Sequence, residues 1–227
     1  MAAPTVPACG KPVLRLLALH GYRQNEKTFR ERTGALRKVL KGRAEIVHIS
    51  ALLAVPEPDV PKDGESDGSR DEPRGWWFSN PQHNSFNAME ETQACSGLDE
   101  SLQTVAKAFS ELGPFNGILG FSQGAALVAM LCSLKQRGDS RFQFDFAMLV
   151  AGFKSRALEH EEFYQQPITI PSLHVYGETD RVIPGSMSQE LALCFEKPVT
   201  LTHAGGHYVP ASAPLKKVYF EFLDMFS

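Results

Sequence analysis

The sequence predicts a doubly wound α/β protein built on a mostly parallel, six-stranded sheet with helices on both faces. Six short apolar runs alternate with helical stretches, and strands that are apolar throughout are typical of a sheet buried on both sides. Residues 120–124 match the pattern G-x-S-x-G, in which a strand turns sharply into a helix. With 227 residues, 43% of them hydrophobic, the chain can bury the core that such a fold needs.

The expected strands cover residues 13–19, 44–50, 115–119, 145–153, 172–176 and 198–203. The first is a nearly continuous apolar run that ends at His20, and the third leads into the G-x-S-x-G pattern. Pro171 opens the fifth strand and Pro198 opens the sixth.

The expected helices cover residues 26–40, 97–112, 125–138, 156–164, 186–195 and 212–226. Asn25 is a candidate N-cap for the first helix. Ser96 with Asp99, and Ser186 with Gln189, resemble capping boxes at the starts of the second and fifth helices.

We expect a single domain over residues 1–227. Residues 1–11 are rich in proline and alanine without periodicity, which indicates a loose N-terminal tail. Residues 55–74 are largely proline-rich and acidic, with little to bury until the aromatic cluster that follows them. They are expected to form a flexible insertion rather than a linker, because neither flank alone is a complete fold.

Composition excludes several function classes. A net charge of −3 and a pI of about 6.2 give no indication of nucleic-acid binding. The four cysteines are far apart, which indicates neither a disulfide framework nor a zinc site, and favours a reducing compartment. Neither a G-x-G-x-x-G motif nor a P-loop is present, and we expect no cofactor and no metal.

No targeting or membrane-spanning segment is evident in the sequence. The apolar run at residues 13–19 contains Arg15 and is too short to cross a bilayer. The expected location is therefore cytoplasmic, with the nucleus possible. The sequence leaves the oligomeric state open.

Ser122, at the centre of the G-x-S-x-G pattern, is the candidate nucleophile. The pattern alone is weak, since a glycine-rich turn with a serine N-cap would also match it. The apolar strand before it and the small-residue helix after it favour a nucleophile elbow. In that arrangement, Gly120 and Gly124 allow the strand and the helix to approach closely.

A serine hydroxyl needs a base to accept its proton and a carboxylate to orient that base. In α/β-hydrolases the carboxylate and then the histidine follow the serine along the chain. Asp180 and His207 follow the last two expected strands, at the sheet edge where Ser122 also lies. Glu178 is a rival that could be a solvated turn residue, and Asp145 is disfavoured because it begins its strand.

The other histidines have expected roles outside the chemistry. His20 is expected to shape the turn below the oxyanion hole. The remaining five are expected to be packed within strands (His48, His174 and His203) or exposed in polar stretches (His83 and His160).

Two backbone N–H groups are the candidate oxyanion hole. The first is that of Gln123, directly after the nucleophile, and the second is that of Tyr22, in the loop after the first strand. Arg23, the next residue, could instead contact substrate.

Trp76, Trp77 and Phe78 form an abrupt aromatic cluster after the insertion. These rings could anchor the insertion to the body of the protein, or they could line a substrate pocket, since pockets are often aromatic. The sequence leaves both alternatives open.

Five blocks of the chain together resemble the FSH family of serine hydrolases, within the α/β-hydrolase superfamily. They are LHGYRQN at 19–25, RGWWF at 74–78, GFSQGAA at 120–126, GETD at 177–180 and GGHYVP at 205–210. The resemblance spans nearly the whole chain. It implies an α/β-hydrolase fold and esterase or thioesterase activity on acyl substrates, with Ser122, Asp180 and His207 as the triad.

The expected function is therefore that of a carboxylic ester hydrolase acting on a small-molecule acyl ester through an acyl-enzyme. Apolar and aromatic residues near the site suggest a hydrophobic, long acyl chain. An acyl thioesterase is the first alternative, because the same machinery cleaves both bonds. A hydrolase-like binding protein, with an intact but unused site, is the alternative of another class.

Overall fold

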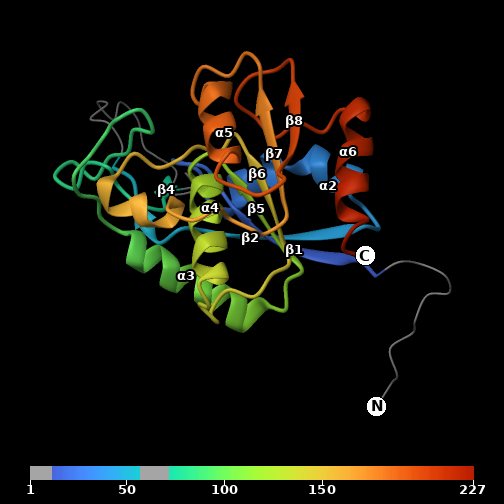
Figure 1. Ribbon diagram of the computed structural model, residues 1–227, viewed down its shortest axis with the longest axis horizontal. Helices are drawn as coiled ribbons and strands as arrows, with labels where there is room; N and C mark the ends of the chain where they lie inside the picture. Colours follow the sequence, from blue (N-terminus) through green and yellow to red (C-terminus); the bar gives the residue numbers. More distant parts are fainter. Residues whose placement is uncertain (1–11, 57–71) are drawn as a thin grey trace, which may run out of the picture.

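In the computed structural model, which describes residues 12–56 and 72–227, six parallel strands form one sheet between two layers of helices (Figure 1). The strands are β1 (Leu14–Leu19), β2 (Ala44–Ile49), β5 (Gly117–Phe121), β6 (Phe146–Val150), β7 (Ser172–Gly177) and β8 (Val199–His203). The predicted α/β class, with its six-stranded parallel sheet, is confirmed.

The strand order, β2-β1-β5-β6-β7-β8, creates a switch point between β1 and β5. From β1 the chain moves outward to β2, and it later returns to the other side of β1 as β5. Leu19 of β1 is therefore level with Ile49 on one side and with Gly120 on the other. Open α/β sheets bind their ligands outside the carboxyl ends of the strands at such a point.

Each face of the sheet has its own hydrophobic core. Leu17 and Leu19 of β1 pack with one set of helices, and Leu16 and Ala18 pack with the other, as the alternation of side chains along a strand requires. The first set is α3 (Leu98–Leu112), α4 (Gln123–Gln136) and α5 (Gly185–Ala192), and the second is α1 (Glu26–Arg32), α2 (Gly34–Val39) and α6 (Ala213–Leu223). Figure 1 shows α3, α4 and α5 on one side of the sheet, and α2 and α6 on the other.

The first predicted helix, residues 26–40, is in fact two short helices that meet at Thr33. The hydroxyl of Thr33 donates to the carbonyl oxygen of Phe29 at 2.8 Å and lies 2.8 Å from Nε2 of His48 on β2. A side chain that bonds back to the preceding turn competes with the regular helix, which accounts for the break. The N-cap prediction is correct, since Asn25 accepts from the N–H of Thr28 at 2.9 Å.

Both capping-box predictions at Ser96 and Ser186 are wrong. Helix α3 begins after Gly97, whose φ of 90° is left-handed, and α5 begins after Pro184; neither start has a side-chain cap. The predicted helix at 156–164 is a 3-10 helix, η1 (Leu158–Tyr164).

Strand β5 begins two residues beyond the predicted start, because Asn116 is used in other contacts. The side-chain oxygen of Asn116 accepts from the backbone N–H of Arg15, and its backbone carbonyl oxygen accepts from the N–H of Asp145. A short antiparallel pair, β3 (Leu53–Ala54) and β4 (Arg74–Gly75), was not predicted. The predicted tail at 1–11 and residues 57–71 of the predicted insertion lie outside the described residues.

In the described parts of the chain, no helix combines the length and the apolar character needed to cross a membrane.

Four of the five buried histidines have strongly lowered pKa values, which gives the fold an expected sensitivity to acid. Burial lowers the pKa of His20, His48 and His160 to about 4, and that of His174 to about 3. Between these values and the ordinary 6.5, the unfolded chain binds protons that the folded protein cannot. Stability is therefore complete above about pH 6.5 and declines as the pH falls toward 4, by up to about 1.4 kcal/mol per pH unit for each histidine.

Urea unfolding between pH 7.5 and 5 measures this decline. The unfolding midpoint should fall with pH, and His174→Gln should make the dependence shallower. The matched control is His83→Gln, because His83 is exposed and its replacement should leave the slope unchanged. An unfolding midpoint that stays constant down to pH 5 would contradict the lowered pKa values of these histidines.

Candidate active site

Ser122 lies at the sharp turn between β5 and α4. Its φ of 54° and ψ of −117° lie outside the regions that side-chain-bearing residues ordinarily occupy. The N–H of Ser122 donates to the carbonyl oxygen of Val150 at 2.9 Å, which extends the pairing of β5 with β6 to the turn. The surrounding contacts thus hold a backbone strain of about 1–3 kcal/mol at this one residue.

The two flanking glycines are required by close backbone contacts. A Cβ on Gly120 would lie 2.5 Å from the carbonyl oxygen of Gly124, and one on Gly124 would lie 2.2 Å from that of Leu19. Both distances fall well inside van der Waals contact. The pattern G-x-S-x-G therefore describes a real steric need at this turn.

Ser122, His207 and Asp180, which are far apart in sequence, form one hydrogen-bonded chain. Nε2 of His207 lies 3.1 Å from Oγ of Ser122, and Nδ1 lies 2.7 Å from Oδ2 of Asp180. The other oxygen of Asp180 accepts from the N–H groups of Val182 and Ile183, both at 2.9 Å. The carboxylate accepts from three groups and its side chain is only 1% exposed, so its orientation is fixed.

A hydrogen bond joins the loops after β7 and β8, and this brings Asp180 and His207 into contact. The N–H of Thr179 donates to the carbonyl oxygen of Gly205 at 3.2 Å. The ring of Phe121 lies 4.7 Å from that of His207 and supports the imidazole from β5. Of the rival carboxylates, Glu178 is exposed and Asp145 lies before β6, at the opposite edge of the sheet.

The N–H groups of Tyr22 and Gln123 lie just beyond the ends of β1 and β5, the two strands that flank the switch point. Tyr22 follows β1, and Gln123 is the first residue of α4, where the helix dipole favours negative charge. Within residues 12–56 and 72–227, neither N–H has a backbone or side-chain acceptor. The N–H of Arg23, by contrast, donates to the carbonyl oxygen of Arg74.

His20 is buried beneath the Tyr22 loop. Its Nδ1 lies 2.7 Å from the carbonyl oxygen of Gly21, and its Nε2 lies 3.0 Å from the N–H of Ala51. Since Nε2 accepts, Nδ1 must carry the proton and donate, and the lowered pKa keeps the ring neutral. A neutral imidazole with both nitrogens bonded holds this loop in place, as the sequence analysis predicted for His20.

The aromatic cluster supports the site from within the core. Trp76 and Trp77 are 0% and 1% exposed, and Phe78 is also buried. The indole N–H of Trp76 donates to the carbonyl oxygen of His20 at 2.8 Å. The side chain of Gln123 accepts from the N–H of Trp76 at 2.9 Å and donates to the carbonyl oxygen of Trp77 at 2.8 Å. These contacts fit the anchoring alternative.

A cleft of about 390 Å³ opens at Ser122, and none of Trp76, Trp77 and Phe78 lines it. The cleft residues include an apolar group that sequence reasoning missed: Phe86, Ala88, Met89, Val182 and Ile183. Phe86 carried no motif signal, because it lies in an irregular segment. Its position follows from ring contacts with Tyr22 and Trp77, each at 5.3 Å.

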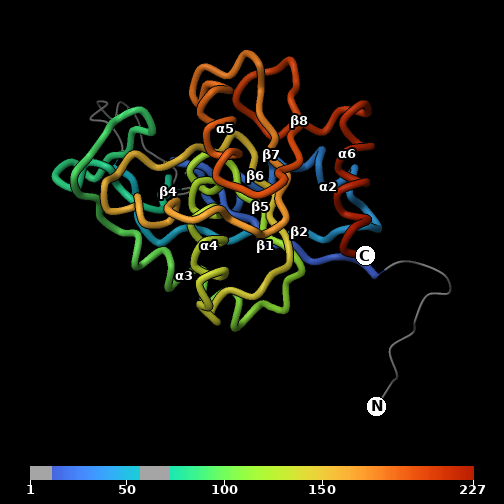
Figure 2. Tube along the Cα trace, in the orientation of Figure 1, coloured from blue at the N-terminus to red at the C-terminus, as the bar shows by residue number. Residues whose placement is uncertain are grey.

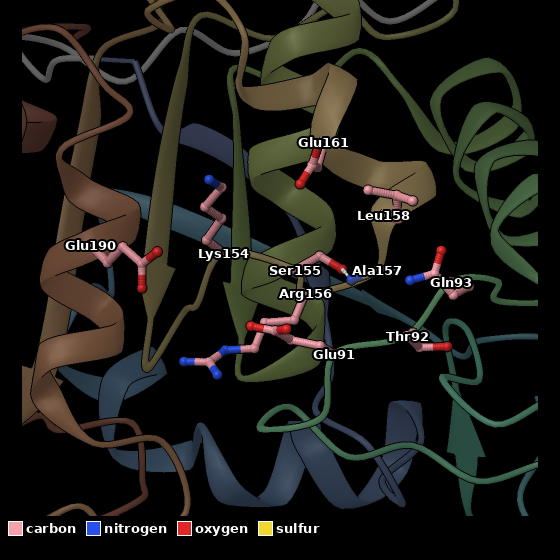
Figure 3. Close-up of a pocket in the computed structure, with 10 residues that line it drawn as sticks. All are labelled: Glu91, Thr92, Gln93, Lys154, Ser155, Arg156, Ala157, Leu158, Glu161 and Glu190. Carbon is pink, nitrogen blue, oxygen red and sulfur yellow. Dashed lines mark hydrogen bonds between the residues drawn. The ribbon is translucent and has the colours of Figure 1, made fainter.

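Another hollow, of about 320 Å³, is lined mainly by polar residues, which include residues 91–93. Figure 3 shows Glu190 entering it from α5 and Glu161 from η1, with Lys154 between them. None of Ser122, Asp180 and His207 lines this hollow. The cleft at Ser122 is therefore the candidate active site.

His160, which was predicted to be exposed, is buried and joins two segments. Its Nε2 lies 3.0 Å from Sγ of Cys95, and its Nδ1 lies 2.8 Å from Oγ of Ser155. Burial and the neighbouring Glu159 raise the pKa of the Cys95 thiol to about 12, so the thiol is a poor nucleophile. The contact is structural: it joins residues 79–97 to η1, and Figure 2 shows these segments side by side.

Among the described residues, no group of three His, Cys, Asp or Glu side chains is arranged to hold a metal ion.

Comparison with known proteins gives a family and a fold. A model of the FSH1 serine hydrolase family matches residues 11–219. Esterase OVCA2 of Xenopus tropicalis is 68% identical over 228 residues, covering 100% of this chain and 99% of the relative. Esterase OVCA2 of Homo sapiens is 52% identical over 220 residues, covering 94% of this chain and 97% of the relative.

Solved structures with low sequence identity share the architecture. Acyl-protein thioesterase 2 of Zea mays superposes with a TM-score of 0.60 at 19% identity, covering 96% of this chain and 97% of that one. SOBER1 of Arabidopsis thaliana superposes with a TM-score of 0.61 at 15% identity, covering 94% of this chain and 99% of that one. The α/β-hydrolase fold is thus confirmed. The family model and the full-length relatives together show that this chain is an ester-cleaving hydrolase and belongs to the FSH1 family of serine hydrolases.

Proposed function

We propose that this protein is a carboxylic ester hydrolase in which Ser122 is the nucleophile, His207 the general base and acid, and Asp180 the residue that orients His207. The observation that carries the proposal is the hydrogen-bonded chain from Ser122 through His207 to Asp180, with distances of 3.1 and 2.7 Å. A chain of this kind activates a hydroxyl that is otherwise a weak nucleophile.

The proposed reaction has two halves. Oγ of Ser122 attacks the acyl carbon while Nε2 of His207 takes its proton, and the N–H groups of Tyr22 and Gln123 stabilise the resulting oxyanion. Collapse of the tetrahedral intermediate breaks the ester bond, and His207 returns the proton to the leaving alcohol. Water activated by His207 then attacks the acyl-enzyme and releases the carboxylic acid.

Labelling with a fluorophosphonate tests the nucleophile directly. The reagent should modify wild type at Ser122, in the peptide that contains residues 120–124, and should leave Ser122→Ala unlabelled. An activated serine reacts because its neighbouring base removes the proton. Labelling at another serine, or none in the folded wild type, would contradict the proposal.

A hydrophobic acyl chain is the proposed substrate feature, because apolar side chains line the cleft. Phe86 and Met89 line it from the 86–89 segment, and Val182 lines it from the loop after β7. Matched 4-nitrophenyl esters of increasing acyl length should show kcat/KM rising from acetyl to octanoyl, since each buried methylene adds about 0.8 kcal/mol. Faster hydrolysis of acetyl and butyryl esters would contradict this feature.

Thioester cleavage is the second candidate, because the fold is shared with a protein named acyl-protein thioesterase 2. The same nucleophile and oxyanion donors would serve both reactions. Oxygen and sulfur esters with the same acyl chain, compared by kcat/KM, distinguish the two.

A further inference from the structure

The charged side chains that line the Ser122 cleft are all cationic or become cationic on protonation. Arg23 and Arg32 line it together with His207, and no aspartate or glutamate is among the lining residues. The whole chain, by contrast, carries a net charge of −3. The lining side chains therefore carry positive charge that the overall composition conceals, while the buried carboxylate of Asp180 lies behind His207.

Neither guanidinium forms an ion pair within the described residues, and that of Arg23 only lies over the ring of Tyr22. Arg43 and Arg74 pair with Asp224 and Glu72, respectively. Among residues 12–56 and 72–227, Arg23 and Arg32 form no such pair, and both are exposed. Their guanidinium groups are thus free to bind an anion that enters the cleft.

The backbone holds Arg23 at the cleft. Its φ of 65° is left-handed, and its N–H donates to the carbonyl oxygen of Arg74 at 2.8 Å, so β4 fixes the turn. Its guanidinium lies 5.8 Å from the ring centre of Tyr22, whose N–H is a candidate oxyanion donor. Arg32 reaches the cleft from the end of α1.

The remaining lining of the cleft is largely apolar, with Phe86, Met89 and Val182 among its members. A ligand that complements the whole cleft is therefore amphipathic, with an apolar body and an anionic group. A guanidinium presents its donors in a planar fork that matches a carboxylate.

Resting on the proposed function, we propose that the preferred substrate is an ester that also carries a carboxylate, which Arg23 and Arg32 bind while Ser122 attacks the ester carbonyl. The two arginines are specificity-determining residues in this scheme. They select the substrate and take no part in the proton transfers.

Two matched pairs of esters test the proposal. The first pair is the 4-nitrophenyl monoester of suberic acid and its neutral methyl ester, which place the charge on the acyl side. The second pair is the octanoyl ester of 4-hydroxyphenylacetic acid and its methyl ester, which place it on the alcohol side. The readout is the ratio of kcat/KM for the charged ester to that for the neutral one.

Wild type should favour the charged member of at least one pair by about tenfold. Arg23→Gln and Arg32→Gln should each lower this ratio by about three- to tenfold, and Arg32→Lys should restore part of it. Arg30→Gln is the matched control, because Arg30 lies on the same helix but does not line the cleft. Added salt should lower the ratio in wild type.

The outcomes separate this inference from the proposed function. A wild type that hydrolyses neutral esters as well as charged ones in both pairs overturns the anion site alone. Arginine variants that slow both members equally also overturn it, because the effect is then structural or on the oxyanion. A wild type that hydrolyses none of the esters counts against both proposals.

Discussion

Replacing Ser122 by alanine is expected to lower kcat for ester hydrolysis by about ten thousand- to a million-fold. The variant keeps the cleft and both N–H donors but lacks the oxygen that forms the acyl-enzyme. Alanine keeps a Cβ at the same backbone angles, so the free energy of unfolding should change little. Initial rates with a 4-nitrophenyl ester, together with a thermal melt, measure both quantities.

The matched control is Ser133→Ala. Ser133 is also a buried serine on α4, yet it lies about three turns from the nucleophile. Its replacement should leave kcat within about twofold of wild type. If the folded Ser122→Ala protein retained a tenth of wild-type activity, another residue would have to supply the nucleophile.

Asp180→Asn is expected to reduce kcat by about ten thousand-fold while the fold persists. In wild type, the N–H groups of Val182 and Ile183 donate to Oδ1 of Asp180, and in the variant the amide oxygen can still accept from them. The amide nitrogen then faces Nδ1 of His207 and donates to it. The imidazole proton is forced onto Nε2, where it blocks acceptance of the proton from Ser122.

Glu178→Gln tests the rival carboxylate under the same conditions. Glu178 is exposed on the same loop, so its replacement should leave kcat nearly unchanged. Steady-state rates across pH 6 to 9 compare the two variants. A large loss in Glu178→Gln with an active Asp180→Asn would reverse the assignment.

The main features of the fold and the positions of the site residues could be predicted because they depend on topology. In a parallel sheet, the carboxyl ends of all strands meet at one edge. Residues that follow different strands of this sheet, such as Ser122, Asp180 and His207, can therefore come together even though the chain between them is long. No side-chain detail is needed for that inference.

Features that depend on tertiary packing could not be predicted. The Thr33 hydroxyl that bonds back to Phe29 at the helix break is also held by His48 on β2, and the buried His160 is held by Cys95 from a distant loop. Local sequence gives the same signal for a helix that continues and for one that is interrupted by such a contact. The aromatic cluster remained ambiguous for the same reason, because Trp76 and Trp77 are apolar whether they face a cleft or the core.

The strand order also has a consequence during synthesis. Strand β1 is made early and pairs with β2, yet its other edge has no partner until β5, which begins at Gly117, has been translated. At about 5–20 residues per second, that interval lasts about 5 to 20 s. Throughout it, a nascent chain would present an apolar strand with an open edge, the kind of surface that invites pairing with another chain. Chaperone dependence and aggregation of truncated chains should therefore be greatest for those that end before β5.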